Sequence, residues 1–429
     1  MQNRKTNKQL SMSVNGVSSQ SMTTKRDNLS RTNKRTKTKM LNKPQNDSIY
    51  PKQYIILFIV ASLTYKMTML PQYLCDIAGR NAYLSMAYML VVEALMVGII
   101  YGVISKGSLF ELNIPKPLKC FFVIIIMLSN FVKGSLNMSG ATSYISVTLF
   151  EKSSIIYVLC ALLPIVLYMA HKGINVIGRT CQICFWFLVI TFVYMFMFAQ
   201  VDCLVCNLLP FKFGGDVFVA CDKQLFWFSD FSPLLFASLV KTSKPTTTPT
   251  IAGLGFMIAC PILLTIVFIS NFGGGAGMVP NALGKLAVYN RISIMLGTVD
   301  FPTVCAWLIM SILKTSILAF GVVRGCKYFF GDKWWATVIV GLAFGAAIFF
   351  GARDLRTAFA ISTSWVRYVI AIIEYGAPMA VYICMKIFDP ERKQKLSTDQ
   401  KRSAKNRRVQ QVDAAKKENL SRQKDKETA

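Results

Sequence analysis

Six ionisable residues lie inside the long apolar stretches of this sequence. They are three lysines and three carboxylic acids: Lys66, Glu93, Lys133, Asp230, Lys314 and Glu374. Each costs about 2.5–3.5 kcal/mol at the centre of a membrane helix unless it is paired or hydrated, so each requires a partner or a ligand. Lys66 differs from the others because it lies beside a proline break, where unwound backbone and a fixed cation favour binding of a ligand carboxylate.

A purely structural explanation is also open for four of these residues. Glu93 can pair with Lys133, and Lys314 with Glu374, solely to hold neighbouring helices together. The sequence does not decide between such pairs and a transport or ligand site.

Two of the apolar stretches are broken in the same way, by polar side chains that precede a proline. Thr64, Lys66 and Thr68 precede Pro71, and Ser229, Asp230 and Ser232 precede Pro233. Proline removes a helical hydrogen bond and clashes with the preceding turn, and the polar side chains can satisfy the freed backbone or a bound ligand. Because the two breaks are five spans apart, they predict a five-plus-five inverted repeat with its site at mid-membrane.

The predicted ligand-binding residues come from the two breaks and from the third and eighth spans. They are Thr64, Lys66, Thr68, Ser229, Asp230, Ser232, Lys133 and Lys314. Lys66 is expected to bind a carboxylate, whereas the hydroxyls and freed backbone of the second break are expected to bind an amino group.

The composition places these residues in a membrane protein. Of the 429 residues, 53% are hydrophobic and 16% are charged, and the mean hydropathy is +0.44. Soluble domains carry about 25% charged residues, and the apolar stretches here are repeatedly long enough to cross a bilayer core of roughly 30 Å. We therefore expect an all-α membrane protein and exclude a soluble enzyme.

Ten spans are predicted, at residues 54–74, 82–105, 118–149, 154–170, 180–200, 226–240, 251–272, 303–323, 334–350 and 365–388.

Both ends of the chain are basic, and residues 1–49 and 389–429 are expected to be disordered tails around a membrane domain of residues 50–388. Residues 1–50 hold 11 Lys/Arg against 2 Asp, and residues 386–429 hold 14 against 7 acidic groups. With an even number of spans, the positive-inside rule places both tails in the cytoplasm. The charge favours contact with anionic membrane lipid or a partner protein and argues against a nucleic-acid groove.

Cysteine and glycine motifs predict no further chemistry. Cys203-x-x-Cys206 lies with Cys221 in a predicted exterior loop and is compatible with a disulfide, but the single histidine, His171, lies on the opposite side. A zinc site is therefore not predicted. The glycine run at residues 273–277 lacks the Gly-Lys-Ser/Thr of a phosphate loop. We predict no metal, no cofactor and no catalytic site.

Four short segments carry a family resemblance. They are Leu70-Pro71 followed by residues 76–85 (DIAGRNAYLS), Lys172-Gly173 through residues 177–179 (IGR), Asn207-Leu208-Leu209-Pro210, and Phe301-Pro302 followed by Trp307 and residues 314–316 (KTS). In this order, over about residues 50–330, they resemble the spore germination permease family, the B subunits of spore germinant receptors. That family belongs to the amino acid/polyamine/organocation transporter group.

The resemblance implies a leucine-transporter-like fold, a pocket between spans one, three, six, eight and ten, and recognition of small germinants such as amino acids. It also implies assembly with an A subunit and a lipoprotein C subunit in the inner membrane of the dormant spore. The relatives' glycine-bearing break in the first span reads Thr64-Tyr65-Lys66-Met67-Thr68 here. A bulky lysine thus occupies space where a substrate or a coupling ion would lie.

Three functions are open on this basis, and none of them is enzymatic. The leading one is a germinant-binding membrane subunit that signals germination. The second is an amino acid or amine permease driven by a proton or cation gradient, in which a buried lysine stands in for the coupling cation. The third is a membrane scaffold without a ligand, whose basic tails recruit other components.

Overall fold

The computed structural model of this protein describes most of the predicted membrane domain. The described residues are 47–148, 154–199, 204–209, 213–240, 247–279, 281–288, 301–351 and 355–388. The predicted tails, residues 1–49 and 389–429, lie outside this part of the chain except for residues 47–49.

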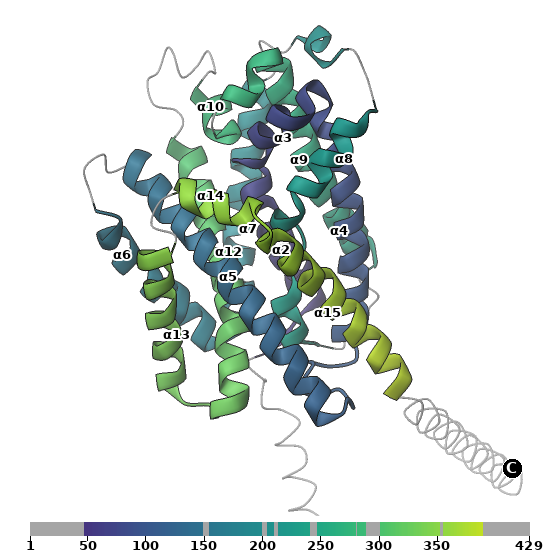
Figure 1. Cartoon of the computed structure of the whole chain (residues 1–429), viewed down its shortest axis with the longest axis vertical. Coiled ribbons are helices and arrows are strands. Elements are labelled where there is room, and N and C mark those ends of the chain that lie inside the picture. The colour runs from purple at the N-terminus through teal and green to yellow at the C-terminus, as the bar shows by residue number, and fades with distance from the viewer. Residues whose placement is uncertain are drawn as a thin grey trace, which may run out of the picture. The chain divides into compact units, whose positions relative to one another are not determined.

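The described chain is almost entirely helical (Figure 1). Its longer α-helices are α4 (Ala82–Ile104), α5 (Lys116–Thr148), α6 (Ile155–Lys172), α7 (Ile174–Ala199), α9 (Thr247–Phe272), α12 (Phe301–Phe330), α13 (Trp334–Ala346) and α15 (Val366–Phe388). The shorter ones are α2 (Pro51–Lys66), α3 (Leu70–Ala78), α8 (Gly215–Lys223), α10 (Ala282–Val288) and α14 (Leu355–Thr363). Eight helical segments are long and apolar enough to cross a membrane, so the chain is a multi-pass membrane protein.

Eight of the ten predicted spans coincide with these eight segments. The other two are the spans in which breaks were predicted. Residues 54–74 fall on α2 and α3, which are separated by a turn. Residues 226–240 contain no α-helix; they form the short 3-10 helices η3 (Leu225–Trp227) and η4 (Ser232–Phe236), joined by an irregular segment.

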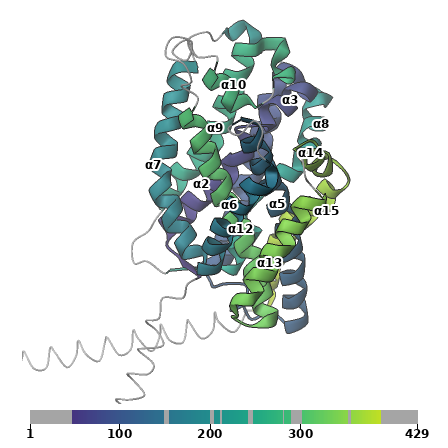
Figure 2. The ribbon, with the colours of Figure 1, turned by 90° about the vertical axis from the view of Figure 1, so that its left-hand side faces the viewer.

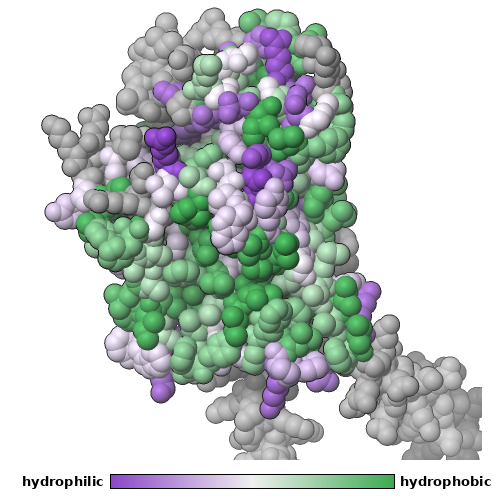
Figure 3. Space-filling model, viewed as in Figure 1, coloured by the Kyte–Doolittle hydropathy of each residue, from purple (hydrophilic) through white to green (hydrophobic). Residues whose placement is uncertain are grey.

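Large apolar side chains cover the outside of the long helices, as expected where lipid is the solvent. Exposed examples on different helices are Leu95, Ile190, Leu342 and Ile372. Figure 3 shows a broad hydrophobic area over the middle and lower part of the visible face, with hydrophilic residues gathered above it. Helix α12 is the exception: 83% of its apolar 18-residue stretch is buried inside the protein, whereas the share is 28–56% in the other seven segments. It is the central helix of the bundle, and α5, α6 and α7 pack against it (Figure 2).

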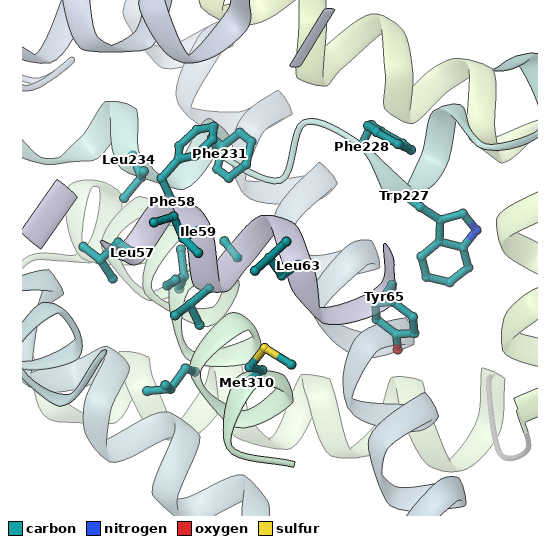
Figure 4. Close-up of a cluster of buried hydrophobic side chains, with 14 of the residues drawn as sticks. Leu57, Phe58, Ile59, Leu63, Tyr65, Trp227, Phe228, Phe231, Leu234 and Met310 are labelled. Atoms are coloured by element: carbon teal, nitrogen blue, oxygen red, sulfur yellow. The ribbon is translucent and has the colours of Figure 1, made fainter. Parts of the chain in front are cut away.

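Aromatic stacking fixes α2 against the irregular segment that follows η3. Phe58 stacks on Phe231 with ring centroids 3.6 Å apart, and Tyr65 lies against Trp227 at 4.5 Å (Figure 4). Offset aromatic pairs contribute roughly 0.5–1.5 kcal/mol beyond the area that they bury. The two broken spans are therefore direct neighbours although they lie more than 150 residues apart in the sequence.

The residues just before α2 form a short parallel strand pair with the end of the second broken span. Strand β1 (Ser48–Ile49) pairs with β2 (Ser238–Leu239), and Ser48 lies opposite Ser238. Asp47 forms an ion pair with Arg324 of α12, and burial raises the pKa of the Asp47 carboxyl above its ordinary value. Residues 47–49, which the sequence places at the end of the N-terminal tail, thus contact the second broken span and α12.

Candidate functional site

The first interruption is a three-residue turn, 67–69, between α2 and α3. Helix α3 begins at Leu70 with Pro71 in its first turn, where proline is tolerated because the amide hydrogen there has no helical acceptor. The freed carbonyl of Thr68 accepts a hydrogen bond from the Ala282 amide at 2.7 Å. The predicted break of span one is confirmed, and α10 supplies one of the donors that it needs.

The second interruption lies between η3 and η4. Ser229 has a φ of 62°, in the left-handed region that serine rarely adopts, and Phe228 is extended. The Phe228 carbonyl accepts a hydrogen bond from the Lys133 ammonium at 3.0 Å, and the Ser229 amide donates to Glu93 Oε1 at 3.2 Å. Charged side chains from α5 and α4 therefore satisfy the backbone that this break frees.

Lys66 is fully buried and forms an ion pair with Glu93 of α4, whose side chain is also fully buried. Its ammonium also donates to Ser62 Oγ at 2.5 Å and lies 4.2 Å from the ring centroid of Phe228. Ser62 in turn donates to Glu93 Oε2 at 3.0 Å. An internal carboxylate thus occupies the position in which the sequence predicted a ligand carboxylate.

Asp230 is held by two lysines from two other helices. Lys133 of α5 donates to Asp230 Oδ1 at 2.6 Å, and Lys314 of α12 donates to Oδ2 at 2.5 Å. All three side chains are 3% exposed. Each carboxylate oxygen therefore has its own cation, which is the arrangement that a buried charge requires.

The two ion pairs that the sequence suggested as a structural explanation are wrong. Lys133 pairs with Asp230 rather than Glu93, and Lys314 also pairs with Asp230 rather than Glu374. Glu374 instead accepts hydrogen bonds on Oε1 from two hydroxyls, those of Ser129 and of Ser232, the latter at 3.0 Å.

All eight predicted site residues are buried, and most of them belong to one connected network. Exposure of each is between 0 and 3%. Asp230 is bound by Lys133 of α5 and Lys314 of α12. The Ser229 amide donates to Glu93 of α4, and Ser232 donates to Glu374 of α15, so four helices are connected to the second interruption. Glu93 also binds Lys66, which adds the first interruption to the network. The hydroxyls of Thr64 and Thr68 donate to the carbonyls of Val60 and Thr64 one turn earlier, and the Thr64 hydroxyl also lies 3.4 Å from the Met310 carbonyl of α12.

Several polar residues of this region were not predicted from the sequence. Ser62 and Ser129 bind the two glutamates, and Asn130 Oδ1 accepts from Ser232 at 3.3 Å. Ser62 lies four residues before Lys66, so helical spacing was the signal that would have identified it. For Ser129 and Asn130 the only signal was polarity within an apolar stretch.

Three buried polar atoms beside the second interruption have no hydrogen-bond partner among the described residues. They are the indole Nε1 of Trp227, the carboxylate Oε2 of Glu374 and the hydroxyl of Tyr375. Trp227 belongs to η3, which packs on α15, the helix that carries the other two. A buried polar group without a partner costs about 1–3 kcal/mol, so these atoms are positioned to bind water or a polar ligand.

The charges around the interruptions balance. Three lysines, at positions 66, 133 and 314, face three carboxyl groups, at positions 93, 230 and 374. The unpartnered atoms supply two donors, from Trp227 and Tyr375, and one carboxyl oxygen, from Glu374. By hydrogen-bonding type, the two donors suit a carboxylate and the carboxylate oxygen suits an ammonium group.

Comparison of the chain with models of known protein families and with curated proteins finds no match. The family resemblance therefore rests on the four segments themselves. In the structure two of them touch: Gly79, with a φ of 55°, ends α3, and the next residue, Arg80, donates to the carbonyl of Leu209. In the region of the cysteine motif, Cys206 and Cys221 are free thiols, while Cys203 lies outside the described residues.

Proposed function

We propose that this chain is the membrane subunit of a spore germinant receptor, which binds a small germinant between its two interrupted segments at mid-membrane and signals germination. The germinant is an amino acid, the partners are the A and C subunits of the receptor, and the location is the inner membrane of the spore with both tails in the cytoplasm. Support comes from the resemblance of the four segments and from the interruptions at residues 67–69 and 228–231.

The proposed membrane domain has ten spans arranged as a five-plus-five inverted repeat of the leucine-transporter type. Eight long apolar helices support this count in part. The α2–α3 pair and the segment from η3 to β2 are proposed to supply the first and sixth spans. In each of them the helical backbone is interrupted near the middle, at residues 67–69 and 228–231. Non-helical backbone at membrane depth is tolerated where it is buried in protein or lines a cavity.

The observation that carries the proposal is the set of unpartnered buried atoms in a charge-balanced core. Trp227 Nε1 and the Tyr375 hydroxyl are proposed to donate to the germinant carboxylate, and Glu374 Oε2 to accept from its ammonium group. A zwitterion adds no net charge to the three lysines and three carboxyl groups already present, so binding leaves no uncompensated charge in the membrane.

Signalling requires that the germinant bind one conformer more tightly than another. Each tenfold preference shifts the equilibrium by about 1.4 kcal/mol. The two interruptions belong to different segments but share Glu93, which binds Lys66 and the Ser229 amide. Glu374 binds Ser232 of the second broken span, and Trp227 belongs to η3 at the start of that span. A germinant that binds Glu374 and Trp227 is therefore proposed to shift the second broken span and, through Glu93, the first.

Spores whose protein carries Tyr375→Phe or Trp227→Phe test this proposal. Tyr375→Phe removes only a hydroxyl that makes no hydrogen bond to the described protein, so its protein level is expected to be unchanged. Trp227→Phe removes an unpartnered donor too, but it also trims a ring that packs on Tyr65, so its protein level is measured alongside the response. A hydrogen bond to a charged group contributes about 1.5–3 kcal/mol, so the germinant concentration for half-maximal germination should rise roughly ten- to hundredfold. Tyr382→Phe, two turns further along α15, is the matched control and should respond like the unmodified protein. An unchanged response of both Tyr375→Phe and Trp227→Phe would contradict the proposed ligand position.

The second candidate function, an amino acid or amine permease, is favoured by the Lys133–Asp230–Lys314 arrangement. Ionisable groups inside membrane proteins frequently mark proton and ion pathways. Uptake of radiolabelled amino acids by proteoliposomes that contain this chain alone separates the two functions. Accumulation driven by an imposed proton gradient would establish a transporter, whereas binding without accumulation is expected of a receptor subunit.

The scaffold alternative is separated from both by comparing the site with the N-terminal tail. If a chain without residues 1–45 loses the germination response while Tyr375→Phe retains it at normal protein level, the tails rather than a ligand site carry the function. A weakened response of Tyr375→Phe at normal level supports the ligand site.

A further inference from the structure

An open cavity of about 610 Å³ lies where α12 passes into α13, at the lower end of the molecule in Figure 1 and far along α12 from Lys314. Its lining comes from the last turn of α6, the end of α12 and the start of α13: His171, Lys172, Lys327, Asp332, Lys333, Trp334 and Trp335. None of these residues takes part in the network around the two interruptions. The volume lies within the range of about 300–1,000 Å³ typical of small-ligand pockets.

A tight turn places cationic groups on the wall of this cavity. Gly331 has a φ of 81°, and its amide donates to the Lys327 carbonyl at 2.9 Å, which ends α12. The turn brings Lys333 to the cavity, while the Lys327 ammonium, on a side chain only 9% exposed, pairs with Asp332 at 2.8 Å. The hydrogen bond from Lys327 lowers the pKa of the Asp332 carboxyl, so this carboxyl is ionised at neutral pH.

Two lysines of the lining have no ion pair within the described parts of the chain. The Lys172 ammonium lies 5.5 Å from the ring centroid of Tyr168, and the Lys333 ammonium lies 6.0 Å from that of Trp335. With Lys327 neutralised by Asp332, the cavity carries two uncompensated positive charges. Helix α13 begins here without a side-chain cap, so its first amides add partial positive charge on the same side.

The rim of the cavity is aromatic and continues into a face of the bundle that is exposed and apolar. Trp334 is 71% exposed, and one turn beyond it Val338 and Ile339 of α13 are also exposed. Tryptophan is enriched where protein meets the membrane–water interface. The cavity therefore opens at the depth of lipid headgroups, next to a surface that acyl chains would cover.

We propose that this cavity binds the phosphate of an anionic phospholipid headgroup. Lys172 and Lys333 are its cationic ligands, the first amides of α13 supply further donors, and Trp334 packs on the glycerol and upper acyl chain of the same lipid. Basic pockets between membrane helices bind lipid phosphates in this way, and indole rings anchor at the same depth. A free phosphate would share the cationic ligands but gain nothing from the aromatic rim.

Native mass spectrometry of the purified full-length chain, titrated with phosphatidylglycerol and separately with zwitterionic phosphatidylcholine, tests the proposal. The unmodified chain is expected to bind phosphatidylglycerol preferentially. The double variant Lys172→Gln/Lys333→Gln should weaken that binding roughly ten- to thirtyfold, because both proposed cationic ligands of the phosphate are lost, at about 1 kcal/mol each. Binding of phosphatidylcholine should not change.

Matched variants keep the result interpretable. Lys106→Gln/Lys116→Gln removes two exposed lysines, one from the α4–α5 connection and one from the first position of α5, neither of which lines the cavity. This variant should leave phosphatidylglycerol binding unchanged. Asp332→Asn changes a side chain that is 78% exposed and removes the counter-charge of Lys327, so the cavity gains one positive charge and binding should tighten several-fold.

The proposal is overturned if the cavity variant binds phosphatidylglycerol as tightly as the Lys106→Gln/Lys116→Gln variant. Inorganic phosphate distinguishes the two sources of the anion. If millimolar phosphate displaces phosphatidylglycerol from the unmodified chain but not from the cavity variant, the site takes a free anion and the lipid assignment fails. Displacement by neither phosphate nor phosphatidylcholine is the result expected of a lipid site.

Discussion

Lys66 and Glu93 form an ion pair between α2 and α4 in which both side chains are fully buried. The second oxygen of Glu93 accepts the amide of Ser229 at 3.2 Å, so the pair connects the end of α2 to the left-handed residue of the other broken span. Two segments that are distant in the sequence are thus held by one carboxylate from a third. Lys66 has a structural role in addition to any part that it takes in ligand binding.

Replacing Lys66 by Met should strongly destabilise the protein. The substitution leaves Glu93 buried with an amide and a hydroxyl but without a cation. Breaking a buried ion pair by removing one partner costs about 3–5 kcal/mol. Thermal unfolding of the purified protein in detergent measures this effect, and Glu93→Gln should lower the melting temperature by a similar amount.

The double variant Lys66→Met/Glu93→Met is the control for this prediction. Replacing both members of a buried pair by apolar side chains of similar size is often neutral, so the double variant should melt at a higher temperature than either single variant. A double variant less stable than both would show that the two residues act independently, contrary to the contact seen here.

Asp230 should be more sensitive than either of the lysines that bind it. Asp230→Asn leaves the ammonium groups of Lys133 and Lys314 together without a counter-charge, at a cost of about 3–5 kcal/mol. Lys314→Met leaves one intact pair and removes one charged hydrogen bond, at about 1.5–3 kcal/mol. Lys133→Met also leaves one intact pair, but it removes the hydrogen bond to the Phe228 carbonyl as well and should cost more than Lys314→Met. Equal melting temperatures for all three variants would contradict the shared arrangement.

Gly321 of α12 marks a close approach between the central helix and the second broken span. A Cβ atom at this position would lie 2.8 Å from Asn130 Nδ2 and 3.0 Å from Pro233 Cβ. Gly321→Ala should therefore destabilise the protein by about 1–3 kcal/mol, as overpacking does. Gly376→Ala in α15 is the control, because a Cβ there meets nothing within 4 Å and alanine favours the helix. Equal melting temperatures of the two variants would argue against this packing.

The strand pair β1–β2 predicts a specific crosslink. Ser48 lies directly opposite Ser238, so Ser48→Cys/Ser238→Cys should form a disulfide under mild oxidation, detectable as a crosslinked peptide by mass spectrometry. Ser48→Cys/Val240→Cys, displaced by two residues along β2, should crosslink much more slowly. Comparable yields would show that the register of the two strands is not fixed.

The long helices were predictable because a membrane span is encoded by local composition. Eight of the predicted spans coincide with helical segments that are long and apolar enough to cross a bilayer. The break at residues 67–69 was predictable for the same reason, since proline and clustered polar residues act on neighbouring backbone. In the second break the prediction was incomplete, because the segment from Phe226 to Val240 forms no α-helix at all.

The partners of the buried charges were not predictable from spacing along the chain. The suggested pairs Glu93–Lys133 and Lys314–Glu374 are wrong, since Lys66 takes Glu93 and Asp230 takes both other lysines. The sequence gives the depth of a charged residue in the membrane only to within about one helical turn, and it does not give the rotation of the helix about its own axis. Two side chains on different helices come into contact only if depth and rotation match on both helices.

From its sequence alone, this protein is a multi-pass helical membrane protein with six buried ionisable groups and two broken spans, because hydropathy, charge and proline act over a few residues. Only the tertiary structure decided that Glu93 joins the two breaks, that Asp230 has two cations, and that Glu374, Tyr375 and Trp227 keep polar atoms without a partner among the described residues. One of those contacts, between Glu93 and the Ser229 amide, joins residues 136 positions apart. These relationships are set by how helices pack in three dimensions, which no local property of the chain contains.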